Sequence, residues 1–152
     1  MATIINADTS DGLKLTSDTS GQIDFQSAGS TKALIDTSGN LKFNSGYGSV
    51  VTAYGVRAWV NFVGTGTVSI NASGNVSSIT DNGVGNYTVN FATNMPDANY
   101  ATQGTSKSTG GNTGFHVILK NATQSVSAFS ILTIDEAGGS YDSALVCISV
   151  LR

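Results

Sequence analysis

The sequence is poor in the residues from which many functional sites are built. Charged side chains make up 11% of it, well under half of the roughly 25% found in typical globular domains. The single cysteine, Cys147, excludes a disulfide framework within one chain, and a single histidine, His116, leaves too few ligands for a zinc site. Cys147 lies in the apolar stretch ALVCISV, where we expect a small buried side chain.

Two long patterns are also missing. No run of Lys and Arg provides the basic patch that binds nucleic acid, and the formal net charge is -3. No apolar run approaches the roughly 20 residues that span a membrane. We therefore expect no nucleic-acid partner and no membrane insertion. The chain is instead rich in Gly, Ser, Thr and Asn, a composition that favours short strands and tight turns over helices.

The N-terminal region repeats a small unit. The stretches DTSDGLKL, DTSGQIDF and DTSGNLKF begin at Asp8, Asp18 and Asp36 and align without a gap. Each has Asp-Thr-Ser, two turn-forming residues and an apolar–charged–apolar triplet, which predicts a hydrogen-bonded Asx turn followed by a very short strand. Calcium binding by these units stays open as an alternative, although neither EF-hand nor nonapeptide-repeat spacing is present.

The triplets predict contacts between chains. Strands of a few residues bury too little apolar area to be stable alone, and a repeat unit with that problem stacks on a neighbour. We therefore predict that residues 1–54 form a short β stalk of three chains, ending in a Gly-rich junction at 44–55. The predicted trimer contacts are Leu13, Leu15, Ile23, Phe25, Leu41 and Phe43.

Residues 55–152 are expected to form a second domain. Alternating apolar residues predict eight strands, near 56–63, 67–71, 75–80, 86–92, 98–105, 114–120, 125–134 and 143–151. Many short strands separated by turns indicate a sandwich, so the predicted fold class is all-β, a β stalk followed by an antiparallel β-sandwich or jelly-roll-like domain. The expected core aromatic residues are Trp59, Phe62, Tyr87, Phe91, Phe115 and Phe129.

Gly-rich loops mark one end of this second domain. Successive antiparallel strands place alternate loops together, so loops 64–66, 81–85, 106–113 and 135–143 should share the end opposite the entry of the chain. Loops held on a rigid scaffold are the usual place for binding contacts. The residues predicted to contact a receptor are Ser106, Lys107, Ser108, Thr109, Asn112, Asp135, Glu136, Tyr141 and Asp142.

Catalytic chemistry is not expected. Asp135, Glu136 and Asp142 bracket one loop, but their sequence positions do not define the carboxylate separation that glycoside cleavage requires. No Gly-x-Ser-x-Gly nucleophile elbow is present, and GTGTVS lacks the lysine of a phosphate loop. We predict no enzyme activity, no cofactor and no metal site, with a polysaccharide depolymerase as a remote alternative.

Residues 56–101 resemble the distal domain of phage tail-fibre and related virion proteins. The resemblance is carried by WVNF, GTGTV, NVSSITDNG, YTVNF and MPDANY, and the N-terminal repeats look like the stalk segment that often precedes this domain. It fades between about Thr102 and Leu145, where receptor-facing variation is expected in such a family.

This resemblance implies a homotrimeric structural protein of the virion. We expect a short tail fibre or fibre tip that attaches the phage to its host. Its partners would be further copies of the chain, another virion protein at the N-terminal region, and a glycan or protein of the host surface. A capsid cement, decoration or head-fibre trimer that stabilises the shell is the alternative.

Overall fold

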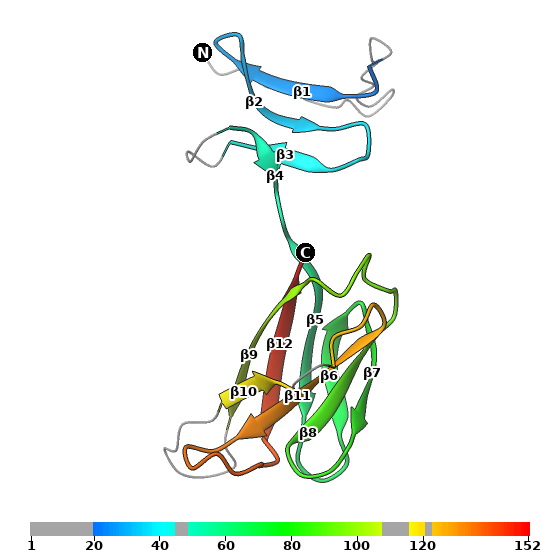
Figure 1. The fold of residues 1–152 in the computed structure, drawn as a ribbon, viewed down its shortest axis with the longest axis vertical. Helices are drawn as coiled ribbons and strands as arrows, with labels where there is room; N and C mark the ends of the chain where they lie inside the picture. The colour runs from blue at the N-terminus through cyan, green and yellow to red at the C-terminus, as the bar shows by residue number, and fades with distance from the viewer. Residues whose placement is uncertain (1–19, 45–48, 108–115, 121–122) are drawn as a thin grey trace, which may run out of the picture. The chain divides into compact units, whose positions relative to one another are not determined.

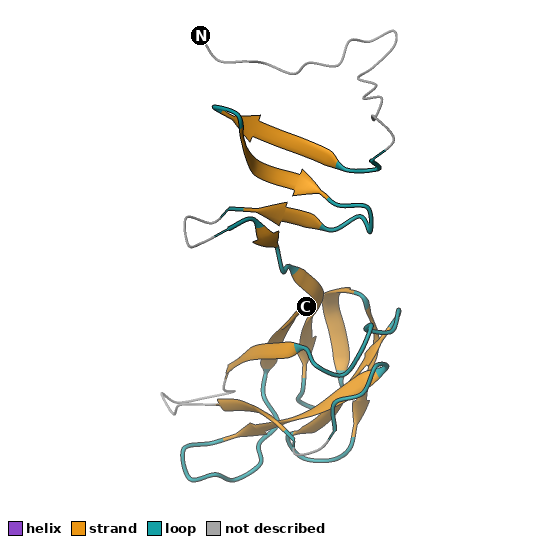
Figure 2. Ribbon diagram, turned by 45° about the horizontal axis from the view of Figure 1, so that its top comes forward, coloured by secondary structure: helices purple, strands orange, loops and turns teal. Residues whose placement is uncertain are grey.

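The computed structural model describes residues 20–44, 49–107, 116–120 and 123–152. Within these residues the chain has twelve strands and no helix, and the strands form three antiparallel four-stranded sheets. The predicted all-β fold class is thereby confirmed, as Figures 1 and 2 show. The chain divides into two compact units, Met1–Ala53 and Tyr54–Arg152, within which residues make most of their contacts. We call them the first and the second unit.

The described part of the first unit is one sheet. It contains, in spatial order, β1 (Ile23–Ser27), β2 (Ser30–Ile35), β3 (Leu41–Phe43) and β4 (Val51–Thr52). Strands β1 and β2 are joined by the two residues Ala28 and Gly29, with φ of 50° and 73°. Two central residues with positive φ form the hairpin turn whose twist matches that of the flanking strands.

A side-chain-capped turn joins β2 to β3. Oδ1 of Asp36 accepts hydrogen bonds from the backbone N–H groups of Ser38 at 3.0 Å and Asn40 at 2.9 Å. Its other carboxylate oxygen lies 2.8 Å from Nζ of Lys42. The Asx turn predicted for the Asp-Thr-Ser repeat is thus confirmed at Asp36, whereas Asp8 and Asp18 lie outside the described residues. The lysine and these amides hold the pKa of Asp36 well below its usual range.

The second unit is a β-sandwich. Its strands are β5 (Val56–Val63), β6 (Ser69–Gly74), β7 (Val76–Asp81), β8 (Asn86–Phe91), β9 (Ala101–Lys107), β10 (His116–Leu119), β11 (Ala128–Ile134) and β12 (Leu145–Leu151). One sheet has the order β6-β5-β12-β9 and the other β10-β11-β8-β7. The eight predicted strands are all present, with ends displaced by a few residues.

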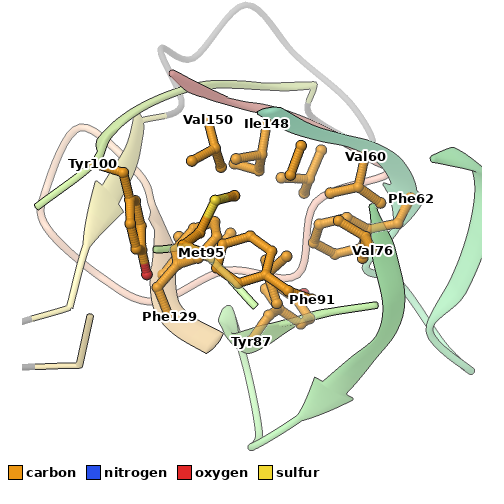
Figure 3. Packing of buried hydrophobic residues seen from close by; sticks show 14 residues of the cluster. Val60, Phe62, Val76, Tyr87, Phe91, Met95, Tyr100, Phe129, Ile148 and Val150 are labelled. Atoms are coloured by element: carbon orange, nitrogen blue, oxygen red, sulfur yellow. The ribbon is translucent and has the colours of Figure 1, made fainter. Parts of the chain in front are cut away.

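The core lies between these two sheets. Its members alternate with outward-facing residues along β5, β8, β11 and β12, because successive side chains of a strand point to opposite faces. Figure 3 shows how they interdigitate. The most deeply buried include Val60, Phe62, Tyr87, Val89, Phe129, Ile131, Val146 and Val150. Near the chain entry, the rings of Phe91, Tyr100 and Phe129 pack together with centroids 5.6 to 5.9 Å apart.

Three expectations need correction. Trp59 is 44% exposed, because it faces away from the core that its neighbours Ala58 and Val60 enter. Cys147 is only partly buried, because it alternates with the buried Val146 and Ile148. The predicted junction at 44–55 contains strand β4, and β2 was not predicted at all. Phe115 lies outside the described residues.

Candidate functional site

Four loop segments meet at one end of the second unit, which we call the loop end. Gly64 N–H donates to the Ser143 carbonyl at 2.9 Å, and Ala144 N–H donates to the Lys107 carbonyl at 3.0 Å. Gly85 N–H donates to Oδ1 of Asp142 at 2.7 Å. The segments around residues 64, 85, 107 and 143 are therefore joined directly, which confirms for these residues that the Gly-rich loops share one end (Figure 1).

A buried tyrosine ties this end to the core. The hydroxyl of Tyr87, a fully buried residue, lies 3.0 Å from both the Gly64 carbonyl and Oδ1 of Asp142. Burial, followed by the hydrogen bond and charge of Asp142, raises the pKa of Tyr87 above its usual range, so the phenol stays protonated at neutral pH. Asp142, predicted as a receptor contact, thus holds two loop segments to the sandwich.

Gly85 permits a close backbone crossing under the loops. Its N–H and carbonyl bond to Asp142 and to the Thr133 N–H respectively, and its φ is +63°. A Cβ at this position would lie 2.6 Å from both the Thr133 carbonyl oxygen and the Tyr141 nitrogen. Thr133 in turn donates its hydroxyl to the Tyr141 carbonyl. The backbone of Tyr141 is therefore fixed by main-chain packing.

Asp135 folds its own loop. Its Oδ1 accepts from the N–H groups of Ala137 at 3.0 Å and Gly139 at 2.8 Å. The carboxylate is thereby used as a turn cap. Glu136, the next residue, is exposed at the tip of this turn. The loop presents its exposed surface through Glu136 and its neighbours, while Asp135 shapes it.

The remaining predicted contacts are distributed unevenly. Lys107 is exposed at the end of β9 and Tyr141 is partly buried. The hydroxyl oxygen of Ser106 is buried, because this residue alternates with the exposed Thr105 and Lys107, and its contact with a receptor stays a prediction. Ser108, Thr109 and Asn112 lie outside the described residues.

The chemistry available at the loop end is that of a contact surface. The carboxylates of Asp135 and Asp142 are both occupied by backbone N–H groups. Among the described residues, no three His, Cys, Asp or Glu side chains gather into a possible metal site. What the loops offer outward is polar surface together with the side chain of Val84, which is 61% exposed, on a frame held by main-chain hydrogen bonds.

A second candidate surface lies on the sheet of the first unit. The register pairs Ile23 with Ile35, and Ile35 with Leu41. The next row pairs Phe25, Ala33, Phe43 and Val51 across all four strands. Directly paired residues and those two apart share one face of a sheet. These seven residues therefore form one side, which we call the apolar face.

Nothing in the described chain covers this apolar face. Phe25 and Phe43 are 43% exposed and Leu41 is 53% exposed, and no described residue of the first unit is buried. Ile23, Phe25, Leu41 and Phe43 were predicted contacts, and the structure brings them together on this face. Leu13 and Leu15 lie outside the described residues. Ile35 and Val51 were missed, although the alternation of Ala33 with Ile35 in TKALID was a usable signal.

Comparison of the chain with models of protein families, with curated proteins and with solved structures finds no match. We therefore base the function on these two surfaces and on the sequence resemblance.

Proposed function

We propose that the chain is a homotrimeric structural protein of a phage virion, a short tail fibre or fibre tip that attaches the particle to the host surface. Three copies associate through their first units, and the loop end of each second unit faces the host. The virion assignment rests on the sequence resemblance. The structural observation that carries the assembly is the uncovered apolar face.

The apolar face supports self-association because of its composition. Six large hydrophobic side chains line one side of a four-stranded sheet, and five of them are between 37% and 53% exposed. Exposed apolar surface of this kind is unfavourable in water and marks an interaction site. The opposite side of the sheet carries Asp24 and Lys42, which are paired with Leu34 across the strands. A continuous apolar surface that a partner could bury is therefore present on one side of the sheet.

The position of the loop end supports a role in attachment. At the other end of the second unit, Arg152 N–H bonds to the carbonyl of Gly55, where the chain enters this unit (Figure 1). Met95 N–H bonds to Val126 at that same entry end. The loop end is therefore the one remote from the entry, and its loops rest on a rigid core, as binding loops usually do.

This proposal is tested by labelling the protein on whole virions and locating the label by electron microscopy. We expect an antibody or a gold label against the chain to mark the tail, and we expect purified protein to compete with the phage for adsorption to host cells. Label confined to a regular array on the head would contradict the tail-fibre proposal and support the capsid-decoration alternative.

The role of the loop end is tested in the same competition assay. A variant with Lys107→Glu and Glu136→Lys inverts two exposed charges and keeps the net charge, so weaker competition by a correctly assembled trimer is expected. Equal inversion of two exposed charges in the first unit, Asp24→Lys with Lys32→Asp, serves as control. Undiminished competition by the loop variant would contradict attachment through this end.

A further inference from the structure

The outer face of the sheet β6-β5-β12-β9 carries a second uncovered surface. Two rows of paired residues cross three of its four strands, β5, β12 and β9. One row consists of Trp59, Ser149 and Gln103, and the other of Asn61, Cys147 and Thr105. All six face outward, because the residues between them point into the core. We call these two rows the Trp59 face.

Trp59 is built into this face. A Cβ at the cross-strand partner Gly74 would lie 2.5 Å from the indole Nε1, so the absence of a side chain lets the ring lie over strand β6. A glycine inside a strand commonly marks such a close approach. The ring nevertheless stays 44% exposed in the single chain. A large aromatic residue is thus held in place with much of its surface in water.

Beside the indole the face is hollowed. A shallow depression of ≈ 590 Å³ is lined by Gln103, Gly104, Thr105, Cys147, Ile148 and Ser149. None of these residues is charged, and the charged side chains on this side, Arg57 and Lys107, lie at the next outward positions beyond the two rows. The centres of two such surfaces can therefore approach without repulsion between like charges. Loss of charged residues and enrichment of aromatic ones is the composition that distinguishes the centre of a protein interface from other surface.

The opposite sheet shows what a solvated face looks like in this protein. On its outer side, Thr88 and Ser130 hydroxyls lie 2.8 Å apart, and Asn90 Nδ2 donates to Ser78 and Thr80 hydroxyls at 3.1 and 3.0 Å. Strands β7 and β8 therefore satisfy one another's polar side chains. On the Trp59 face, only Asn61 has a side-chain partner of this kind, the amide of Asn71.

The chain itself indicates what covers the Trp59 face. Strand β4 ends at Thr52 and β5 begins at Val56, so only three residues connect the sheet of the first unit to this sheet. If first units associate, each second unit is held within a few residues' length of its copies. A short link of this kind gives a local concentration on the order of millimolar, at which a modest surface is occupied.

We propose that the Trp59 face is an interface between second units, covered by a further copy of this chain. The inference rests on the proposed self-association of the first unit and extends it to the second. Three sandwiches turn their sheets β6-β5-β12-β9 toward a common axis, with Trp59 and Thr105 buried between copies. The Asn90 side of each sandwich stays in water.

Thiol labelling of the full chain tests this interface. In a Cys147→Ser background, Thr105→Cys places a thiol on the Trp59 face and Thr80→Cys places one on strand β7. Both threonines are exposed on strands of the single chain, which makes them a matched pair. In the native assembly we expect Ellman's reagent to react at least about ten-fold more slowly at position 105, and equally fast at both positions in guanidinium chloride, because accessibility then no longer differs.

Light scattering on the same samples separates the possible failures. A trimer in which both thiols react equally fast overturns the interface and leaves the proposed self-association standing. That result would mean that the Trp59 face is open to another protein or to a small ligand. A monomer contradicts the proposed self-association, and the interface with it. Slow labelling at position 105 in a trimer, with the wild-type mass retained, supports both.

Discussion

At the scale of single residues, strand parity explains both what the sequence predicts and where the prediction is wrong. Trp59 and Phe62 are three apart on one strand, so they face opposite sides, and only one can enter the core. Phe62 is fully buried and Trp59 is not. The same alternation leaves Cys147 only partly buried beside the buried Val146. Tryptophan and cysteine are residue types that are often buried, but the alternation of the strand turns Trp59 and Cys147 away from the core.

The raised pKa of Tyr87 makes the stability of the second unit depend on pH. Its folded-state pKa is raised above the ordinary value of 10.0, so the folded state keeps a proton that the unfolded state loses. The stability that this adds is fully present below about pH 10 and is lost as the pH rises further.

We therefore expect the free energy of unfolding to fall above pH 10 by up to about 1.4 kcal/mol per pH unit for this proton. Tyr87→Phe should be less stable at pH 7 by about 1–3 kcal/mol, because Asp142 and Gly64 lose a buried partner. It should also lose this part of the pH dependence. Denaturant unfolding of the wild type and of Tyr87→Phe at pH 7 and pH 11 measures both quantities. If both proteins lose the same free energy of unfolding between pH 7 and pH 11, this role of Tyr87 is contradicted.

At the scale of elements, the two units differ in how far the sequence predicts them. In the second unit, alternation over six to eight residues in β5 and β8 is long enough to define strand and face together. In the first unit, β3 has three residues and β4 has two. So few residues give almost no periodicity, which is why β4 was not predicted. Strand β2 has six residues, and it was missed although Ala33 and Ile35 alternate within it.

The loop end was predictable as a location and unpredictable in its chemistry. The number of antiparallel strands determines which loops lie together, and that requires only the count. Whether an acid faces solvent or caps a turn depends on backbone geometry within the loop. Asp135 accepts bonds from N–H groups two and four residues further on, which is a local turn. Asp142 accepts from the N–H of Gly85, 57 residues away, and no local sequence pattern indicates this.

The apolar face of the first unit is the element on which assembly depends. Phe43→Asp places a charge in the middle of this face, so association should weaken at least about ten-fold, because burying one such side chain contributes about 1.5–3 kcal/mol. Gln26→Asp adds the same charge at an exposed position outside the face and serves as control.

Sedimentation velocity over a range of protein concentrations measures the association of both variants. Circular dichroism checks that the sandwich of the second unit remains folded in each. If Phe43→Asp associates as tightly as Gln26→Asp, the apolar face does not join the copies.

At the scale of the whole molecule, the two units pose opposite problems of stability. The second unit has a fully buried core and needs no partner to explain it. The described first unit has no buried residue, so its apolar face stays in contact with water, which is unfavourable. The simplest chain that completes the apolar face is another copy of itself, so the functional molecule that we propose is an assembly of three.

The mass of the purified protein in solution tests this central claim most directly. Size-exclusion chromatography with multi-angle light scattering should give about three times the 15.5 kDa mass of one chain, and the mass should persist on dilution into the low micromolar range. A stable species of 15.5 kDa with intact strand structure would contradict the account, because the apolar face of the first unit would then be folded and uncovered in water.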